Sequence, residues 1–440
     1  YLADHEVNLK ILFQPLLESG ELSRPDRDEV LEEVADAVVG RVLSRVRSQH
    51  RVLSFDQWRS QRCLAEYREA VAWLSTDPAA SAALDVVPDR DALRARRARY
   101  PGLTRPELST VLACAKNVLK RRLLDSPGLL DDPACEPFLS GYFPHPIPTE
   151  FEGPMGAHVL RREIIAAELS NQLVDTSGCT FVHRLVSDTG VGVAEAVRAW
   201  VIAFEVADAR DLVGGLWPDG DGDVLTGEAT IRVQDTLMRI LERLATWILG
   251  NVVPDRAMCN VIRALRARLA DMTEDLPGCF SASEAEAFHC RAAEFEMIGV
   301  SEDLSRRLAL LECVDGALDV AAIAAEAGAQ WKEMAKLFYG LGAWLDFPWL
   351  SARIAETDDE DFWKHRAARG LAEDLARARC RLVYRLYKTG ATRAGLDALG
   401  TRRNGCLLYT SDAADESSRG VWGGGGGGGW GGGGGGGGGG

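Results

Sequence analysis

A short polar group near the start of the chain is the densest collection of residues that could do chemistry. It consists of Asp4, His5, Glu6 and Asn8, within the segment DHEVNLKIL. Side chains of these types can form one wall of a binding site for a polar substrate. The alternative is that they cap and tether a helix, because short polar clusters are common where helices start. The sequence favours the tether, and the four residues stay candidates for a position next to a substrate.

A single histidine, His183, lies among apolar neighbours in a helix predicted over Thr180–Ser187. A zinc site needs several donors at matched spacing. No second histidine or cysteine stands at such a spacing, and the chain contains no CxxC pair. We therefore predict that His183 is a hydrogen-bonded packing residue and that the chain holds no metal.

The motifs that hold nucleotide phosphates or a catalytic nucleophile are missing before the glycine-rich end of the chain. There is no GxGxxG after a strand, no GxxxxGK[ST], no HExxH and no GxSxG. The acidic run Asp358–Asp361 is better interpreted as the solvated start of a helix. The sequence therefore predicts no catalytic and no cofactor-binding residue in this chain.

The period of the apolar residues predicts an all-α, multi-helix fold. The clearest helix is Gly102–Ser126, with Thr104 as its N-cap and Glu107 three residues later. Its buried stripe should contain Leu108, Val111, Leu112, Ala115, Leu119 and Leu123. Other helices are expected at Ser23–Arg47, Phe55–Leu74, Leu160–Asp175, Glu228–Leu249 and Asp255–Ala270, with a last pair at Asp359–Ala368 and Leu371–Tyr387. No stretch shows convincing strand alternation.

Proline and polar residues mark the interruptions between these helices. The stretch Ser75–Asp89 is the best linker in the first half and predicts a domain boundary near residue 90. The proline-rich stretch Asp131–Pro154 should wrap over the surface. Asn171 falls in line with the apolar face of its helix, which predicts a buried amide.

Two segments, Val193–Trp217 and Trp331–Leu350, show a weak internal similarity. A large aromatic residue is followed at the same offsets by an aspartate and a leucine, the aspartates being Asp208 and Asp346. Two copies are fewer than a solenoid needs. We interpret the pair as a helix and turn used twice.

Charge and cysteine usage restrict the partners and the compartment. The formal net charge of -15, without a basic tract, argues against nucleic acid or an anionic membrane surface as the main partner. No apolar run approaches the roughly 20 residues that span a bilayer. The 10 cysteines include no paired motif, as is typical of the reducing cytoplasm. Tyr1 is not followed by a signal-like stretch, and we expect the chain to begin in mid-protein.

The end of the chain, Cys406–Gly440, reads as a sequencing artefact. CLLYTSDAADE is the translation of a transposase sequencing adapter, and the glycines that follow are broken only by single tryptophans. A tryptophan codon differs by one base from a glycine codon. We exclude 406–440 from fold reasoning and expect no packed contacts from it. The alternative is a native glycine-rich linker.

Five blocks of the sequence resemble the large NAD-specific glutamate dehydrogenases of bacteria, in the same order. They are DHEVNLKIL from Asp4, LTRPELSTVLACAKNVLK from Leu103, YFPHPI from Tyr142, LRREIIAAELSNQLVD from Leu160 and GCTFVHRLVSDTG from Gly178. The resemblance thins beyond these blocks and extends to about Arg385. It implies the helical region that follows the catalytic domain in that family.

The resemblance implies how the chain is divided into domains and which domain carries out the reaction. Residues 1–89 would be the link from the catalytic domain with a first helical pair, and residues 90–400 a C-terminal helical domain. The reaction, L-glutamate with NAD and water to 2-oxoglutarate, NADH and ammonium, would be carried by a domain upstream of Tyr1, which would bind the NAD. This fragment alone would be inactive.

The same resemblance suggests partners and a place for the polar group. The partners would be the chain's own upstream catalytic domain and further copies of itself, and Asp4, His5, Glu6 and Asn8 would lie near the glutamate site. The family has serine where this chain has Ala3. The competing hypothesis is a free-standing helical interaction module without enzymatic activity. A dinucleotide-binding fingerprint in frame upstream of Tyr1 would favour the first.

Overall fold

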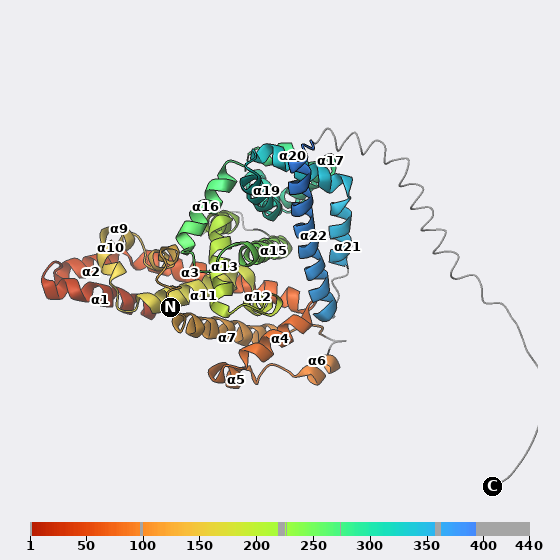
Figure 1. Cartoon of the computed structure of the whole chain (residues 1–440). Coiled ribbons are helices and arrows are strands. Elements are labelled where there is room, and N and C mark those ends of the chain that lie inside the picture. The colour runs from red at the N-terminus through yellow and green to blue at the C-terminus, as the bar shows by residue number, and fades with distance from the viewer. Residues whose placement is uncertain are drawn as a thin grey trace, which may run out of the picture.

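The computed structural model describes residues 2–96, 100–218, 225, 227–272, 274–356 and 362–392. Throughout this part of the chain the regular structure is helical and no strand is present, so the predicted all-α class is confirmed. No helix in these ranges is long and apolar enough to cross a membrane. The segment 406–440, interpreted as an artefact, lies outside the described residues. Figure 1 shows the arrangement of the helices.

The helices of the first half build the part of the molecule that carries the N-terminus. They are α1 (Leu2–Ser19), α2 (Arg24–Glu33), α3 (Ala35–Ser60), α4 (Leu64–Leu74), α5 (Pro78–Leu84), α6 (Arg90–Arg96), α7 (Arg105–Leu124), the 3₁₀ helix η1 (Pro133–Cys135), α8 (Glu136–Tyr142), α9 (Ile147–Glu150), α10 (Glu152–Gly156), α11 (Arg161–Ser177) and α12 (Phe181–Thr189).

The helices of the second half complete the fold. They are α13 (Val193–Val206), α14 (Ala209–Leu216), α15 (Gly227–Asn251), α16 (Met258–Ala270), the 3₁₀ helix η2 (Leu276–Cys279), α17 (Ala282–Met297), α18 (Glu302–Leu311), α19 (Val314–Ala327), α20 (Trp331–Trp344), α21 (Phe347–Glu356) and α22 (Phe362–Lys388).

Helix α7 forms as its sequence predicts. Thr104 and Glu107 make a capping box, in which the Thr104 backbone N–H donates to Glu107 Oε2 at 2.7 Å. The predicted apolar stripe is buried, and Leu108 and Val111 are 0% exposed. Helix α7 packs against α11, and both belong to a core shared with α3, α13 and α15.

The boundaries of the first helices differ from the prediction. The helix expected over Ser23–Arg47 ends early as α2, and Val34 separates it from α3. Helix α3 then continues to Ser60, so that the expected Phe55–Leu74 helix is divided between α3 and α4. The reason is packing, since buried residues such as Val52 and Phe55 continue the inner face of α3 beyond the point where its charge pattern suggests an end.

Three further predictions about local structure were wrong. The stretch Asp131–Pro154 forms short helices that carry buried apolar residues into the core instead of wrapping over the surface, among them Phe138, Leu139, Phe143 and Ile147. Asn171 is half-buried, not buried. The expected last pair of helices is one helix, α22, because a single glycine such as Gly370 lowers helix stability without ending the helix. The start of that pair, residues 359–361, lies outside the described residues.

The internal similarity corresponds to a shared geometry. Asp208 joins α13 to α14 with a φ of 50°, and Asp346 precedes α21 after α20 with a φ of 60°. Within the described ranges these are the two residues other than glycine with positive φ. Aspartate tolerates this conformation because its short side chain can hydrogen-bond locally. The structure supports a helix and turn used twice.

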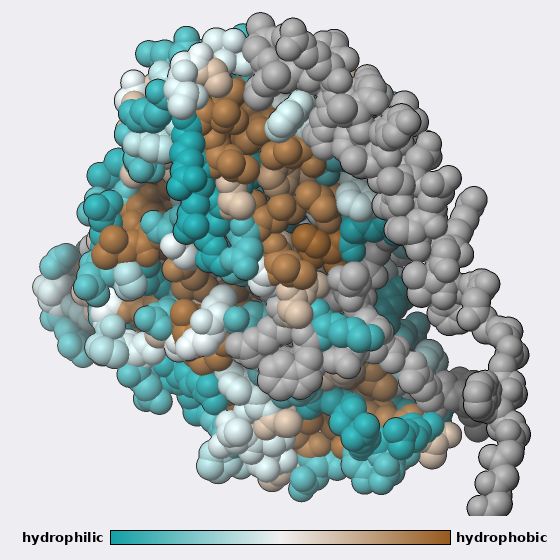
Figure 2. All heavy atoms as spheres, turned by 45° about the vertical axis from the view of Figure 1, so that its right-hand side comes forward, coloured by the Kyte–Doolittle hydropathy of each residue, from teal (hydrophilic) through white to brown (hydrophobic). Residues whose placement is uncertain are grey.

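A second, smaller core lies among the later helices. It includes Phe280, Phe288, Phe338 and Val383, from η2 through α22. In Figure 2, where the α21 and α22 side of Figure 1 comes forward, apolar residues gather beside hydrophilic ones. These two helices carry exposed apolar side chains, including Trp349 at 53% and Leu371 at 58%.

Candidate functional site

The polar group near the N-terminus is divided by the helical period of α1. His5 and Asn8 are buried, with 4% and 8% of their surface exposed. Asp4 and Glu6 are exposed, and Glu6 pairs with Lys10 at 2.6 Å one turn later. The structure therefore places only His5 and Asn8 against the rest of the molecule.

His5 and Asn8 both contact Tyr142, at the end of α8 in the YFPHPI block. The His5 ring stacks on the Tyr142 ring with 4.2 Å between centroids. Asn8 Nδ2 donates to Tyr142 Oη at 2.7 Å. His158 Nδ1 accepts from the Leu160 backbone N–H, so its Nε2 carries the proton and donates to the Asn8 carbonyl at 3.1 Å. This set, His5, Asn8, Tyr142 and His158, is called the α1 anchor below.

Burial keeps His5 and Tyr142 of the α1 anchor uncharged at neutral pH. Desolvation, with the nearby cations of Arg45 and Arg41, lowers the pKa of His5 to about 4. Desolvation also raises the pKa of Tyr142 to about 12. A neutral imidazole and a neutral phenol suit a structural role such as the predicted tether, which stays a prediction. The other predicted role, a wall beside the glutamate site, stays a prediction.

A buried carboxylate that the sequence does not single out lies between α3 and α12. Asp56 is 0% exposed, accepts from Tyr67 Oη at 2.7 Å and accepts from the Cys179 backbone N–H at 3.2 Å. Burial raises the pKa of Asp56, although the hydrogen bonds from Tyr67 and Cys179 oppose the shift. The residue in the sequence that could have indicated this site is Gly178, next to Cys179. A glycine is favoured there because φ is 85° and the position lies against the Asp56 carboxylate.

An ion-pair network lines a cavity of about 900 Å³ between α3, α4, α12 and α15. Arg184 bridges Glu66 and Glu242 at 3.1 Å each, and Arg59 pairs with Glu66 at 3.0 Å and Asp235 at 3.4 Å. Burial alone would lower the pKa of the Arg184 guanidinium, but the carboxylates of Glu242 and Glu66 raise it. Sequence reasoning missed this network, because its members come from four separate helices.

His183 lies in the lining of the same cavity. Its ring packs near the Trp73 ring at 5.7 Å, and burial lowers its pKa. His183 thus packs as predicted, and its Nδ1 atom has no hydrogen-bond partner. In the part of the chain that the structure describes, no three His, Cys, Asp or Glu side chains are grouped to hold a metal ion.

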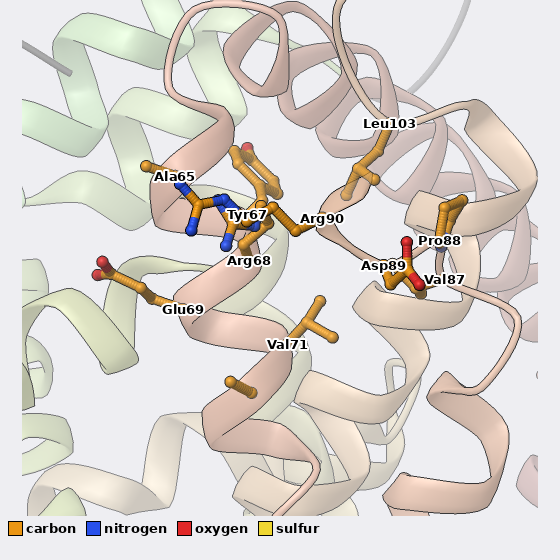
Figure 3. A pocket seen from close by; sticks show the side chains of 11 residues that line it. Ala65, Tyr67, Arg68, Glu69, Val71, Val87, Pro88, Asp89, Arg90 and Leu103 are labelled. Atoms are coloured by element: carbon orange, nitrogen blue, oxygen red, sulfur yellow. The ribbon is translucent and has the colours of Figure 1, made fainter. Parts of the chain in front are cut away.

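A smaller cavity of about 360 Å³ adjoins the first and is shown in Figure 3. Its apolar lining includes Val71, Val87 and Leu103. Arg68 and Arg90 line both cavities. Figure 3 shows their side chains together with Asp89 and the other residues that line this cavity.

Comparison with known proteins identifies two regions, with residues 57–99 between them. Residues 100–399 match a family model described as "Glutamate dehydrogenase, C-terminal", and residues 1–56 match "Bacterial NAD-glutamate dehydrogenase, catalytic domain". Neither match includes residues 57–99.

Three relatives are each named NAD-specific glutamate dehydrogenase. They come from Halomonas elongata (30% identical over 384 residues), Pseudomonas aeruginosa (28% over 373) and Mycobacterium tuberculosis (27% over 388). The alignments cover 87%, 85% and 88% of this chain but 23%, 23% and 24% of the relatives. The chain thus spans less than a quarter of the length of these relatives. It belongs to the glutamate dehydrogenase C-terminal family and corresponds to a region of the large bacterial NAD-specific glutamate dehydrogenases.

Proposed function

We propose that this chain anchors and positions the catalytic domain of an NAD-dependent glutamate dehydrogenase. The oxidation of L-glutamate with NAD is carried by residues upstream, and the described helices hold the end of the catalytic domain in place. The family match and the lack of any phosphate-binding motif in this chain support the division. Assembly into homo-oligomers in the cytoplasm belongs to the same proposal.

The observation that carries the proposal is a core shared by the two matched regions. Residues 1–56, which match the catalytic-domain model, provide Phe13, Val52 and Phe55, all 0% exposed. They belong to one apolar cluster with residues of α7 and α11 in the C-terminal match. Helix α3 contacts α7, α11 and α15 directly. Such continuous burial favours one rigid unit, because separating the two regions would expose its apolar surface to water.

Polar contacts across the same boundary support a fixed orientation. Each one pairs a residue of 1–56 with a residue of 100–399. They are Asn8 with Tyr142, Arg45 with Glu168, and Asp56 with the Cys179 backbone. Hydrogen bonds are directional, so these contacts fix the register of α1 and α3 on the helical region as well as holding them there.

Helix α3 also presents an apolar side to solvent. Val39, Leu43 and Val46 follow the helical spacing and are 44%, 51% and 49% exposed. On α1, Val7 is 54% exposed. All four lie in the part that matches the catalytic domain, and the occupant we propose for this side is the remainder of that domain. Helices α1 and α3 would then lie between the catalytic core and the helical region.

The proposal is tested by substituting a charged residue on this side of α3 in the whole enzyme. Leu43→Asp should lower glutamate-dependent NAD reduction, because it buries a charge where α3 meets the catalytic domain. The control is Ala37→Asp, an exposed position on the same helix that lies on a different side from Leu43. The isolated chain should fold normally with either change, since both sites are exposed in it. If the two whole-enzyme variants are equally active and equally assembled, the docking role of α3 is wrong.

A further inference from the structure

The two adjoining cavities form one groove with chemically different ends. The smaller cavity is lined mainly by apolar atoms, among them those of Val71 in α4, Val87 before α6 and Leu103 before α7. The larger one is lined by charged side chains. Arg68 of α4 and Arg90 of α6 stand where the two meet, since both line each cavity, as does Glu69. A molecule spanning the junction would meet guanidinium groups at one end and an apolar wall at the other.

Four arginines in this groove have no carboxylate partner among the described residues. They are Arg62, Arg68, Arg90 and Arg94, all exposed. Arg62 donates to the Trp58 carbonyl at 3.1 Å and lies over the Trp58 ring, which leaves its charge unneutralised. Arg90 and Arg94 are one turn apart on α6, a spacing at which like charges repel. An anion bound beside these two arginines would reduce their repulsion, so the repulsion favours anion binding.

The acidic residues that line the groove are already engaged, Glu69 and Asp188 included. Glu66 is shared between Arg59 and Arg184, and Asp235 pairs with Arg59 and Arg239. Asp89 accepts the Ala92 backbone N–H at 2.9 Å at the start of α6. The Arg184 side chain is only 7% exposed, and its Nε has no hydrogen-bond partner although it lines the cavity. The buried side of the groove is thus an ion-pair network, and the four exposed arginines without a carboxylate partner among the described residues lie nearer the solvent.

We propose that this groove binds a small organic anion, a phosphate or carboxylate group attached to an apolar body. The guanidinium groups of Arg68 and Arg90 hold the anionic group through charge-assisted hydrogen bonds, and the apolar body lies against Val71, Val87 and Leu103. A volume of about 360 Å³ for the apolar end is within the size range of small-molecule sites. The four arginines lie in residues 57–99, which neither family match includes.

The test is calorimetric titration of the purified chain with phenyl phosphate, phenylacetate and inorganic phosphate. At least one of the two organic anions should bind saturably and more tightly than inorganic phosphate. Binding of phenyl phosphate alone would assign the site to phosphate esters, and binding of phenylacetate alone would assign it to carboxylates. Added salt should weaken the binding, because the rim is open to solvent.

The decisive variant is Arg68→Gln with Arg90→Gln, which should weaken binding by about tenfold or more through loss of charge-assisted hydrogen bonds. Arg381→Gln, which removes an exposed arginine from α22, is the matched control and should bind as the unchanged chain does. Circular dichroism and thermal unfolding verify that both variants fold. The proposal is overturned if neither organic anion binds at millimolar concentration. Equal affinity in the Arg68 and Arg90 double variant would also overturn it.

Discussion

The ammonium of Lys116 lies 2.6 Å from the carboxylate of Asp175, inside the interface between α7 and α11. The two side chains are 10% and 9% exposed. Burial lowers the pKa of Lys116 and raises that of Asp175, while the attraction between the two opposes both shifts. The Asp175 carbonyl also accepts from Gln234 Nε2 at 3.0 Å. Two helices that meet mainly through apolar residues are therefore also aligned by one buried ion pair.

Removing one partner of this ion pair should destabilise the fold strongly. Lys116→Met leaves the Asp175 carboxylate buried and unpaired, and we expect a loss of about 3 kcal/mol or more in the free energy of unfolding. Urea unfolding measures it. The double variant Lys116→Met with Asp175→Leu should recover part of the loss, because it removes both charges of the pair, while Arg51 loses the nearby Asp175 carboxylate. A double variant as unstable as the sum of the two single changes would contradict this.

Gly178→Ala should cost more than an ordinary change at a helix end. Gly178 has a φ of 85°, and an added Cβ would lie 2.9 Å from Asp56 Oδ1. Gly190 closes α12 with a φ of 74° but has no neighbouring atom within 4 Å of an added Cβ. We expect Gly190→Ala to cost about 1 kcal/mol and Gly178→Ala at least about 2 kcal/mol, measured by urea unfolding. Equal losses would mean that the Asp56 side chain moves aside freely.

His5 of the α1 anchor should make the free energy of unfolding decrease at acidic pH. The pKa of His5 is about 4 in the fold and 6.5 as its ordinary value, so the unfolded chain binds a proton in this window that the folded chain does not. Stability should therefore decrease as the pH falls from about 6.5 to 4, by no more than about 3 kcal/mol from this residue. His5→Gln should make the dependence shallower. Unfolding measured at several pH values in both forms isolates the contribution, and identical pH slopes would contradict it.

A charged residue in the apolar stripe of α7 should lower the activity of the whole enzyme, although it leaves the catalytic residues unchanged. Leu112 is 7% exposed, and Leu112→Asp should cost several kcal/mol through lost packing and desolvation. We expect lower activity through instability or misassembly, with NAD binding by the upstream domain retained. Asn117→Asp, an exposed position on the same helix, is the control. Full activity and normal assembly of the Leu112 variant would show that α7 has no part in docking.

This chain by itself should not reduce NAD with glutamate. It contains none of the phosphate-binding motifs that hold a dinucleotide. The measurement is the increase in NADH absorbance with purified chain, glutamate and NAD, against a full-length relative as positive control. Turnover above background would reveal a site that neither the sequence nor the fold indicates.

The sequence alone determined the local structure of this protein, as α7 illustrates. Thr104, Glu107 and the apolar stripe from Leu108 to Leu123 act within one helix, so their spacing is sufficient to predict its start and its buried face. The turns at Asp208 and Asp346 were likewise visible as a matching pattern. The five blocks that resemble the glutamate dehydrogenases are also continuous stretches of sequence, so they indicate the family without knowledge of the fold.

Only the tertiary structure decided which polar residues meet in the interior. Asp4, His5, Glu6 and Asn8 looked alike in the sequence, and the packing of α1 on α8 turned two of them inward and left two in solvent. Lys116 and Asp175 are 59 residues apart in the chain, and neither stands out from other charged residues on a helix. A helical period fixes which residues share a face, but the partner of that face depends on how the helices pack. The desolvation that shifts a pKa or buries an ion pair exists only after that packing.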